Sequence, residues 1–378
     1  MKVKNLYICI VIICIVSLSC NKRSILLDYN EILISYPSDG YTRDMFINND
    51  SLFVVNELDG LVVYKINEEE TSSSLNILYS DTSYFSNYNL SGLQFSSKLN
   101  KIFLIDKFYS IFHIGESEIF EVSPSYQKIG GFSDSHHPSK ISINELDEKV
   151  ELYTLIRNVS GLEGIPTDIV SIYKVDITSS SIGSPIKIID SLNYNTTDIF
   201  YEKKLFISNT SRENYELSIY KKENKIIEYD GECDSLSGQV VPVETPFAID
   251  IIGNECIYFI LDNKISTSYI PKAVKVSDDL LFIGMGDHGG VKIYDINSLD
   301  EMLWFAQGFS VRNIYYSPQT RRIIMSCGYQ GVVVSDLNEN LSIVDTKVIT
   351  TSYAYTARIY SNYLFASTRN GIEIIKIN

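Results

Sequence analysis

Four segments of the chain share one eight-residue pattern, and they superimpose without a gap. Each reads glycine, apolar, any residue, apolar, any residue, lysine or aspartate, apolar, asparagine, at residues 60–67, 290–297, 331–338 and 371–378. Apolar residues at every second position are typical of a half-buried β-strand, and the terminal glycine and asparagine are turn residues. The repeat therefore predicts a fold built from one recurring strand arrangement.

Two further apolar segments precede each copy, so each copy is expected to be the third strand of a unit. The second strands are expected at residues 52–55, 280–283, 322–326 and 363–367, and the first at 44–47, 273–276, 313–316 and 357–360. Weaker copies of the third strand occur at residues 109–114, 170–175 and 217–221. Antiparallel strands that recur in this way are the blades of a β-propeller. We expect an all-β protein: a single β-propeller of four-stranded antiparallel blades.

The third-strand pattern resembles the repeat of the LVIVD family of bacterial and archaeal cell-surface propellers. The resemblance covers nearly all of the chain beyond the N-terminal 30 residues, and it implies a scaffold without a catalytic residue in the repeat. We expect seven blades, with an irregular insert near residues 233–269. Eight blades are the alternative, because residues 246–252 resemble the inner strand expected at residues 271–277.

The two ends of the chain are expected to complete the last blade together. The sequence stops after a third strand, and residues 32–36 form an apolar segment just before the first unit. If that segment supplies the missing outer strand, the ring has no open edge left to pair with another molecule. We therefore expect one propeller domain over residues 31–378, closed by an N-terminal strand.

The first 20 residues have the features of a secretory signal peptide. Lys2 and Lys4 precede an apolar run at residues 6–16, which is shorter than the roughly 20 residues that span a bilayer. A small residue before Cys20 resembles the bacterial lipoprotein signal, which implies that Cys20 is lipidated and that residues 21–30 are a tether. The resemblance implies an envelope protein outside the cytoplasm, and Asn21 favours the outer membrane over the inner one. An ordinary secretory peptide or an uncleaved anchor is the alternative.

Charge and cysteine content exclude some partners. The chain has 47 acidic and 32 basic residues, a formal net charge of −15, which repels nucleic acid and anionic lipid headgroups. Membrane attachment is therefore expected only through the N-terminal lipid. The six cysteines form no CxxC pair or metal-ligand spacing, and we expect neither a cofactor nor a metal.

Candidate binding residues follow from the strand order. Loops that join second to third strands and loops that join one blade to the next emerge on the same face, which is the usual binding face of propellers. The expected face contains Asp59, His136, His137, Arg212, Asp287, His288, Tyr329, Tyr353, Tyr355 and Arg369, with Tyr41 beside them. Tyrosine rings on such a face can clamp a peptide or stack on a sugar, although tyrosine is also a common strand residue.

Two classes of function remain open. We expect a non-enzymatic scaffold that binds an envelope protein, a peptide or a glycan through this loop face, because the sequence contains no nucleophile elbow, P-loop, zinc-protease motif or calcium loop. The alternative is a propeller hydrolase or lyase with an active site in the funnel, in which Asp287 and His288 would act. A metal ion held by His136 and His137 together with Asp287 and His288 is a further alternative. We favour the interpretation that these histidines are solvated loop residues.

Overall fold

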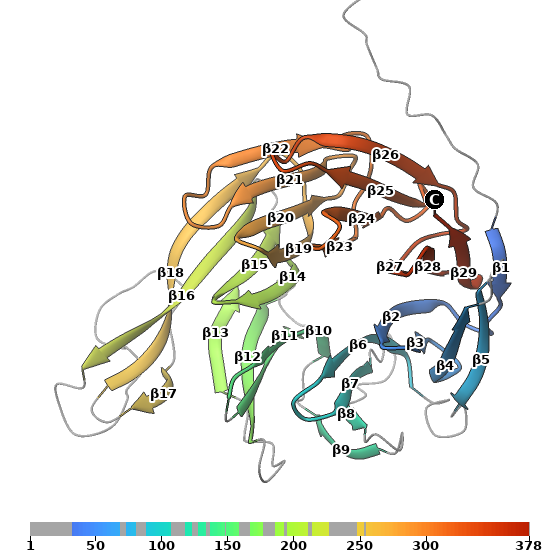
Figure 1. Cartoon of the computed structure of the whole chain (residues 1–378). Coiled ribbons are helices and arrows are strands. Elements are labelled where there is room, and N and C mark those ends of the chain that lie inside the picture. The colour runs from blue at the N-terminus through green and yellow to red at the C-terminus, as the bar shows by residue number, and fades with distance from the viewer. Residues whose placement is uncertain are drawn as a thin grey trace, which may run out of the picture.

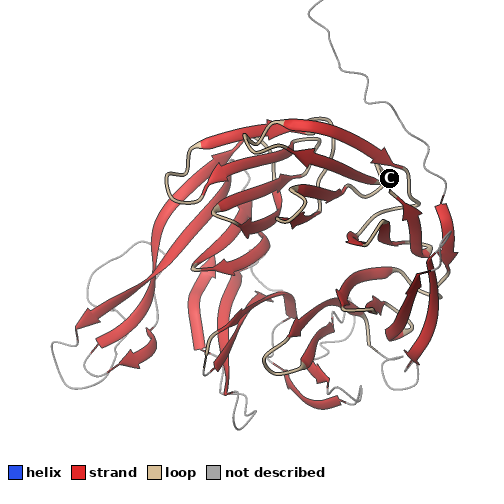
Figure 2. Cartoon of the chain, in the orientation of Figure 1, coloured by secondary structure: helices blue, strands red, loops and turns tan. Residues whose placement is uncertain are grey.

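The computed structural model describes residues 32–68, 73–80, 88–106, 118–122, 128–133, 137–147, 149–158, 167–176, 186–192, 195–210, 214–226, 248–252 and 255–377. These residues form strands and loops only (Figure 2). A helix long and apolar enough to cross a membrane is therefore not found in this part of the chain. Residues 1–31, with the predicted signal peptide, Cys20 and the tether, lie outside the described residues.

The strands form seven antiparallel sheets, numbered here as blades 1 to 7. Blade 1 contains β2 (Thr42–Asn48), β3 (Ser51–Asn56), β4 (Gly60–Glu68) and β5 (Ser73–Ser80). Blade 2 contains β6 (Leu90–Ser96), β7 (Lys101–Asp106), β8 (Glu118–Val122) and β9 (Lys128–Ser133). Blade 3 contains β10 (His137–Glu145), β11 (Lys149–Asn158), β12 (Thr167–Asp176) and β13 (Ile186–Leu192).

Blade 4 has five strands: β14 (Asn195–Glu202), β15 (Lys204–Thr210), β16 (Tyr215–Ile226), β18 (Glu255–Thr267) and β17 (Ala248–Ile252). Blade 5 contains β19 (Pro271–Ser277), β20 (Leu280–Met285), β21 (Gly290–Asp295) and β22 (Glu301–Phe305). Blade 6 contains β23 (Asn313–Ser317), β24 (Arg322–Ser326), β25 (Val332–Leu337) and β26 (Ile343–Ile349). Blade 7 contains β27 (Thr356–Tyr360), β28 (Tyr363–Thr368), β29 (Gly371–Lys376) and β1 (Ile32–Tyr36).

The blades surround a central axis (Figure 1). The innermost strands contact one another in the order β2, β6, β10, β14, β19, β23 and β27, and β27 contacts β2 again. β1 pairs antiparallel with β29, from Ile32 opposite Ile375 to Tyr36 opposite Ile372. The seven-bladed propeller and its closure by an N-terminal strand are therefore confirmed.

The repeat glycine has a structural cause. The glycine stands at the start of the third strand or just before it, and its φ is positive: +74° at Gly290, +80° at Gly331 and +110° at Gly371. Other residues adopt this conformation only with strain. A Cβ on Gly331 would lie 2.1 Å from the carbonyl oxygen of Ile349 in the fourth strand, and one on Gly371 would lie 2.0 Å from that of Tyr36. Tyr36 thus occupies in blade 7 the place of a fourth-strand residue, which is why the pattern recurs in a blade closed by β1.

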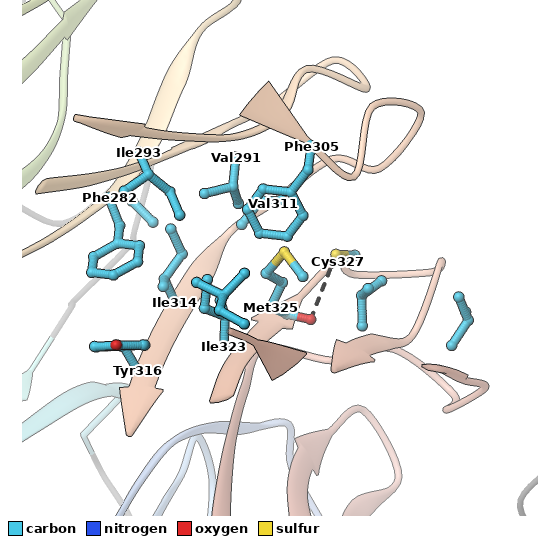
Figure 3. Close-up of a cluster of buried hydrophobic side chains, with 14 residues drawn as sticks. Phe282, Val291, Ile293, Phe305, Val311, Ile314, Tyr316, Ile323, Met325 and Cys327 are labelled. Atoms are coloured by element: carbon cyan, nitrogen blue, oxygen red, sulfur yellow. Dashed lines mark hydrogen bonds between the residues drawn. The ribbon is translucent and has the colours of Figure 1, made fainter. Parts of the chain in front are cut away.

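Apolar side chains are buried between neighbouring blades, not within single sheets. Seven clusters of buried residues are found among the described residues, and each joins two adjacent blades. Figure 3 shows the cluster between blades 5 and 6, where Phe282 and Ile293 face Tyr316 and Ile323. Another cluster joins the last blade to the first, with Phe365 and Ile374 against Leu52 and Val54. Every blade therefore buries both of its faces.

The middle of the chain departs from the sequence prediction in two places. The third strand of blade 2 is β8, at Glu118–Val122, and not residues 109–114, which lie outside the described residues. β17 includes most of the segment that suggested an eighth inner strand. It pairs with the first residues of β18, and β18 in turn pairs along its length with β16. The eight-blade alternative is wrong, because this segment extends blade 4 outward (Figure 1). The second half of the predicted irregular insert is the regular fourth strand of that blade.

The glycine argument predicts unequal costs for two alanine substitutions. Gly308 also has a positive φ, +99°, but a Cβ there would meet nothing within 4 Å. We expect Gly308→Ala to cost about 1–3 kcal/mol from backbone strain. Gly331→Ala adds a collision with a backbone carbonyl, so it should cost about 2 kcal/mol more. Urea unfolding followed by circular dichroism measures both, and equal losses would contradict this origin of the repeat.

Candidate functional site

Four tyrosines and three arginines gather at one end of the ring, and we call them the rim cluster: Tyr41, Tyr329, Tyr353, Tyr355, Arg43, Arg312 and Arg369. Their positions follow from the antiparallel strand order, because loops between second and third strands and loops between blades emerge at the same end. The residues come from blades 1, 6 and 7 and their connections, so segments distant in the sequence meet across the closure of the ring.

Tyr353 is the centre of the rim cluster. Its ring centroid lies 4.6 Å from those of Tyr329 and Tyr355. The guanidinium carbon of Arg369 lies 4.4 Å from the same centroid, and that of Arg312 lies 5.6 Å from it. Stacking of a guanidinium on an aromatic face is favourable and leaves the planar hydrogen-bond donors at its edge. The tyrosines therefore fix the direction of the arginine side chains.

The three arginines differ in their pairing. Arg43 donates from Nε to Oε1 of Glu57 at 2.7 Å, and its guanidinium also stacks on Tyr41 and Tyr355. Arg369 donates to the hydroxyl of Tyr329, and its Nε is buried without a hydrogen-bond partner. Within the described ranges, neither Arg312 nor Arg369 forms an ion pair with a carboxylate. Two cations at the rim therefore have no counter-charge among the residues that the structure describes.

A cavity of about 500 Å³ lies below the rim cluster, and we call it the mouth cavity. Its lining residues are polar or aromatic: Arg43, Asp44, Glu57, Asn89, Ser91, Ser139, Lys140, Arg312, Asn313, Tyr353, Tyr355, Thr356 and Arg369. It shares Asp44, Ser91, Ser139, Lys140 and Asn313 with a second cavity of about 480 Å³ along the axis, so the two adjoin. Four basic and two acidic residues line the mouth of a protein whose net charge is −15.

We call the second, axial cavity the channel, and several charged residues of the inner strands line it. Asp44 accepts a hydrogen bond from the backbone amide of Leu93 in blade 2 at 3.2 Å, and Asp198 accepts one from Val274 in blade 5 at 2.9 Å. The Nζ atom of Lys140 lies 3.6 Å from Oδ1 of Asp198. Each aspartate therefore joins its inner strand to that of the next blade while it contributes negative charge to the channel.

Burial in the channel changes the acidity of these groups. It raises the pKa of Asp44, although Arg358 opposes the rise, and it raises the pKa of Asp198 against the opposing effect of Lys140. Burial also lowers the pKa of Lys275, and the positive charge of Arg358 lowers it further. The main cause is the loss of hydration around the ammonium group of Lys275, and the nearby charge of Glu202 opposes the fall in its pKa.

Three of the predicted site residues line the mouth cavity: Tyr353, Tyr355 and Arg369. Tyr329 belongs to the rim cluster but not to the lining. Asp59 accepts a hydrogen bond from the backbone amide of Asp39 at 3.0 Å and holds a turn. His137 begins β10 and pairs with Arg157, whereas His136 and Arg212 lie outside the described residues.

Asp287 and His288 form an exposed turn between β20 and β21, the second and third strands of blade 5, with positive φ at both residues. The backbone amide of His288 donates to Ser310 Oγ at 3.0 Å, and its Nδ1 lies 2.9 Å from the carbonyl oxygen of Gly308. Neither residue lines the mouth cavity. No three histidine, cysteine, aspartate or glutamate side chains in the described ranges are grouped to hold a metal ion.

The sequence analysis missed Arg43, Lys140, Arg312 and the channel charges. Asp44, Lys140 and Asp198 each follow a register shift in the pairing of an inner strand, and Gly92 occupies the same place in blade 2. This equivalence is seen only in the structure, and the residue at that place is charged in some blades and uncharged in others, so the sequence offered no clear signal. The alternation of the third strand alone does not reveal them.

The rim cluster predicts different roles for two of its tyrosines. Tyr353 is only 5% exposed, whereas Tyr329 is 70% exposed. We expect Tyr353→Ala to lower the free energy of unfolding by about 3–5 kcal/mol, as for other buried aromatic residues. Tyr329→Ala should change it by about 1 kcal/mol or less, because it loses only exposed stacking. Chemical denaturation measures both, and equal effects would mean that Tyr353 does not organise the rim.

No family model matches the chain, and no curated protein matches it in sequence. Solved structures do match: a chain of the crystal structure of the mitotic checkpoint complex has a TM-score of 0.59 at 11% identity, over 93% of this chain and 94% of that chain. The WD40 β-propeller domain of Doa1 has 0.57 at 12% identity, over 93% and 98%. The computationally designed protein Ika8 has 0.56 at 10% identity, over 92% and 100%. At these identities the likeness concerns the fold: the chain is a β-propeller with seven blades.

Proposed function

We propose that this chain is a non-enzymatic, lipid-anchored binding protein of a bacterial cell envelope, built on LVIVD-type repeats. Its partner is an envelope protein, a peptide or a glycan, which binds at the rim cluster and the mouth cavity. The outer membrane is the proposed site, with attachment through Cys20. The observation on which the proposal rests is the gathering of tyrosines and arginines around a cavity that adjoins the channel.

Binding is supported by the residue types at the rim. Tyrosine and arginine are enriched at binding hot spots, because they combine a large contact area with directed hydrogen bonds. Tyr329 is largely exposed beside Arg369, so a partner can reach both side chains. A chain of the mitotic checkpoint complex has a similar fold, which offers a precedent for a propeller that works within an assembly.

The surroundings of the titratable residues favour binding over catalysis. His288 and Asp287 belong to a turn outside the cavity lining, and the imidazole of His288 contacts a backbone carbonyl. Asp44 does line the cavity, but its two oxygens accept hydrogen bonds from the amides of Met45 and Leu93. A general base needs a free oxygen or nitrogen directed at the substrate. His288 lies outside the lining of the mouth cavity, and Asp44 is engaged in the contact between the inner strands of blades 1 and 2.

The envelope address is tested by replacing the lipidated residue in the full-length chain. After expression in a bacterium with two membranes, we expect the wild-type chain in the outer-membrane fraction, with an acylated N-terminal peptide that starts at Cys20. Cys20→Ser should abolish acylation and release the protein from the membrane, whereas Cys14→Ser, within the signal, should change neither. Mass spectrometry of the N-terminus decides, and cleavage at another position would overturn the lipoprotein proposal.

The binding role is tested by capture from detergent-solubilised envelopes with the tagged full-length chain. We expect a specific partner that is lost with Tyr329→Ala combined with Arg369→Gln. Lys203→Gln is the matched control, because Lys203 lies in a loop between first and second strands at the opposite end of the ring. Equal capture by the rim variant and the control would contradict the proposal. Turnover of a glycan, lactone or phosphoester that requires Asp287 and His288 would favour the enzyme alternative.

A further inference from the structure

The unpaired arginines at the rim point to an anionic group in the ligand. Arg312 and Arg369 both lie over the ring of Tyr353, and no carboxylate in the described residues forms an ion pair with either. The Nε of Arg369 is buried and has no hydrogen-bond partner. A buried donor without a partner is costly, and a guanidinium presents donors at a spacing that matches two carboxylate oxygens. A carboxylate between these side chains would satisfy both requirements.

The cavity lining gives the rest of the ligand's chemistry. None of the residues around the mouth cavity has an aliphatic side chain, and the neutral ones are serine, threonine, asparagine and tyrosine. Hydroxyl and amide groups of this kind exchange hydrogen bonds with a ligand that has many hydroxyls. Peptide side chains, by contrast, are usually recognised in apolar pockets. The lining therefore favours a sugar over a peptide segment that binds through apolar side chains, and an acidic peptide is compared with the sugar in the test below.

Size and long-range charge limit the ligand further. A volume of about 500 Å³ is within the usual range for small-molecule pockets, roughly 300–1,000 Å³. It accommodates one end of a glycan, not a folded domain. The net charge of −15 repels polymers with many negative charges at a distance. A ligand with a single acidic group is repelled less, and at the mouth it meets more basic than acidic residues.

We propose that the mouth cavity binds the carboxylated sugar, a uronate, at one end of an acidic glycan, with the carboxylate held between Arg312 and Arg369. Arg43, neutralised by Glu57, forms the wall beside this position, and the polar side chains below it bind the sugar hydroxyls. This inference rests on the proposed binding function and names the class of its ligand.

The test compares pairs of sugars that differ only in the carboxylate. The full chain is titrated with methyl glucuronide and methyl galacturonide, and with the neutral methyl glucoside and methyl galactoside, by saturation-transfer NMR and calorimetry. We expect at least one uronide to bind at least tenfold more tightly than its neutral partner. A fourfold increase in salt concentration should weaken this binding, since the contact is an ion pair near the surface.

Substitutions at the rim separate the clamp from the fold. Arg369→Gln and Arg312→Gln should each weaken uronide binding at least tenfold, whereas Lys203→Gln should leave it unchanged. Arg369→Lys keeps the charge without the fork, so it should restore part of the affinity. Unfolding curves of each variant show whether the fold is kept. If Arg369→Gln is unstable, the affinity of Arg369→Lys for the uronide tests the role of the guanidinium instead.

Three results would overturn the inference: equal binding of uronides and neutral sugars, unchanged binding in both arginine-to-glutamine variants, or tighter binding of an acidic tripeptide than of either uronide. Absence of uronide binding is a fourth such result. If the rim variant still loses its envelope partner in that last case, the proposed binding function survives and only the ligand class is wrong. Loss of both effects would refute both proposals.

Discussion

Apolar contact between the faces of neighbouring sheets is the interaction on which the whole ring depends. Each blade buries two faces, and the cluster of Phe365 and Ile374 against Leu52 and Val54 joins the last blade to the first. A single blade would expose both faces to water, so its stability comes from its neighbours. The N-terminal strand completes this arrangement, because Ile34 and Tyr36 pack against the same cluster that joins the two ends of the ring.

This packing leaves the inner strands to line a channel. Side chains between blades form the apolar clusters, whereas the channel is lined by charged and polar residues together with apolar ones. Asp44 and Asp198 use the position to accept amide hydrogen bonds from the next blade, which connects adjacent inner strands. Arg358 and Lys275 add positive charge, and burial lowers the pKa of both. Aspartates and cations of the inner strands are thus buried together in the channel.

At the rim, the residues that support the site differ from those available to a ligand. Tyr353 is buried and determines where two guanidiniums lie, while Tyr329 and Arg312 are exposed. Glu57 neutralises Arg43 but nothing comparable neutralises Arg312 or Arg369 in the described ranges. A site with its aromatic support in place and its counter-charge missing is organised for an anion before the anion arrives.

The propeller, the positions of the strands in its best repeats and the closing strand could all be predicted from the amino-acid sequence. These features depend on local chemistry: a glycine with positive φ under a fourth-strand carbonyl and an alternation that separates two faces. Loop position also predicted that Tyr353, Tyr355 and Arg369 share one end of the ring. The folded ring was needed to show that β8 stands in place of residues 109–114, that β17 pairs with β18, and that Arg43 meets Tyr355 across the closure. The first two depend on which of several apolar segments pairs with a neighbouring strand, and the apolar alternation alone does not select between them. The third joins residues some 300 positions apart, so it exists only once the apolar faces of seven blades have closed the ring.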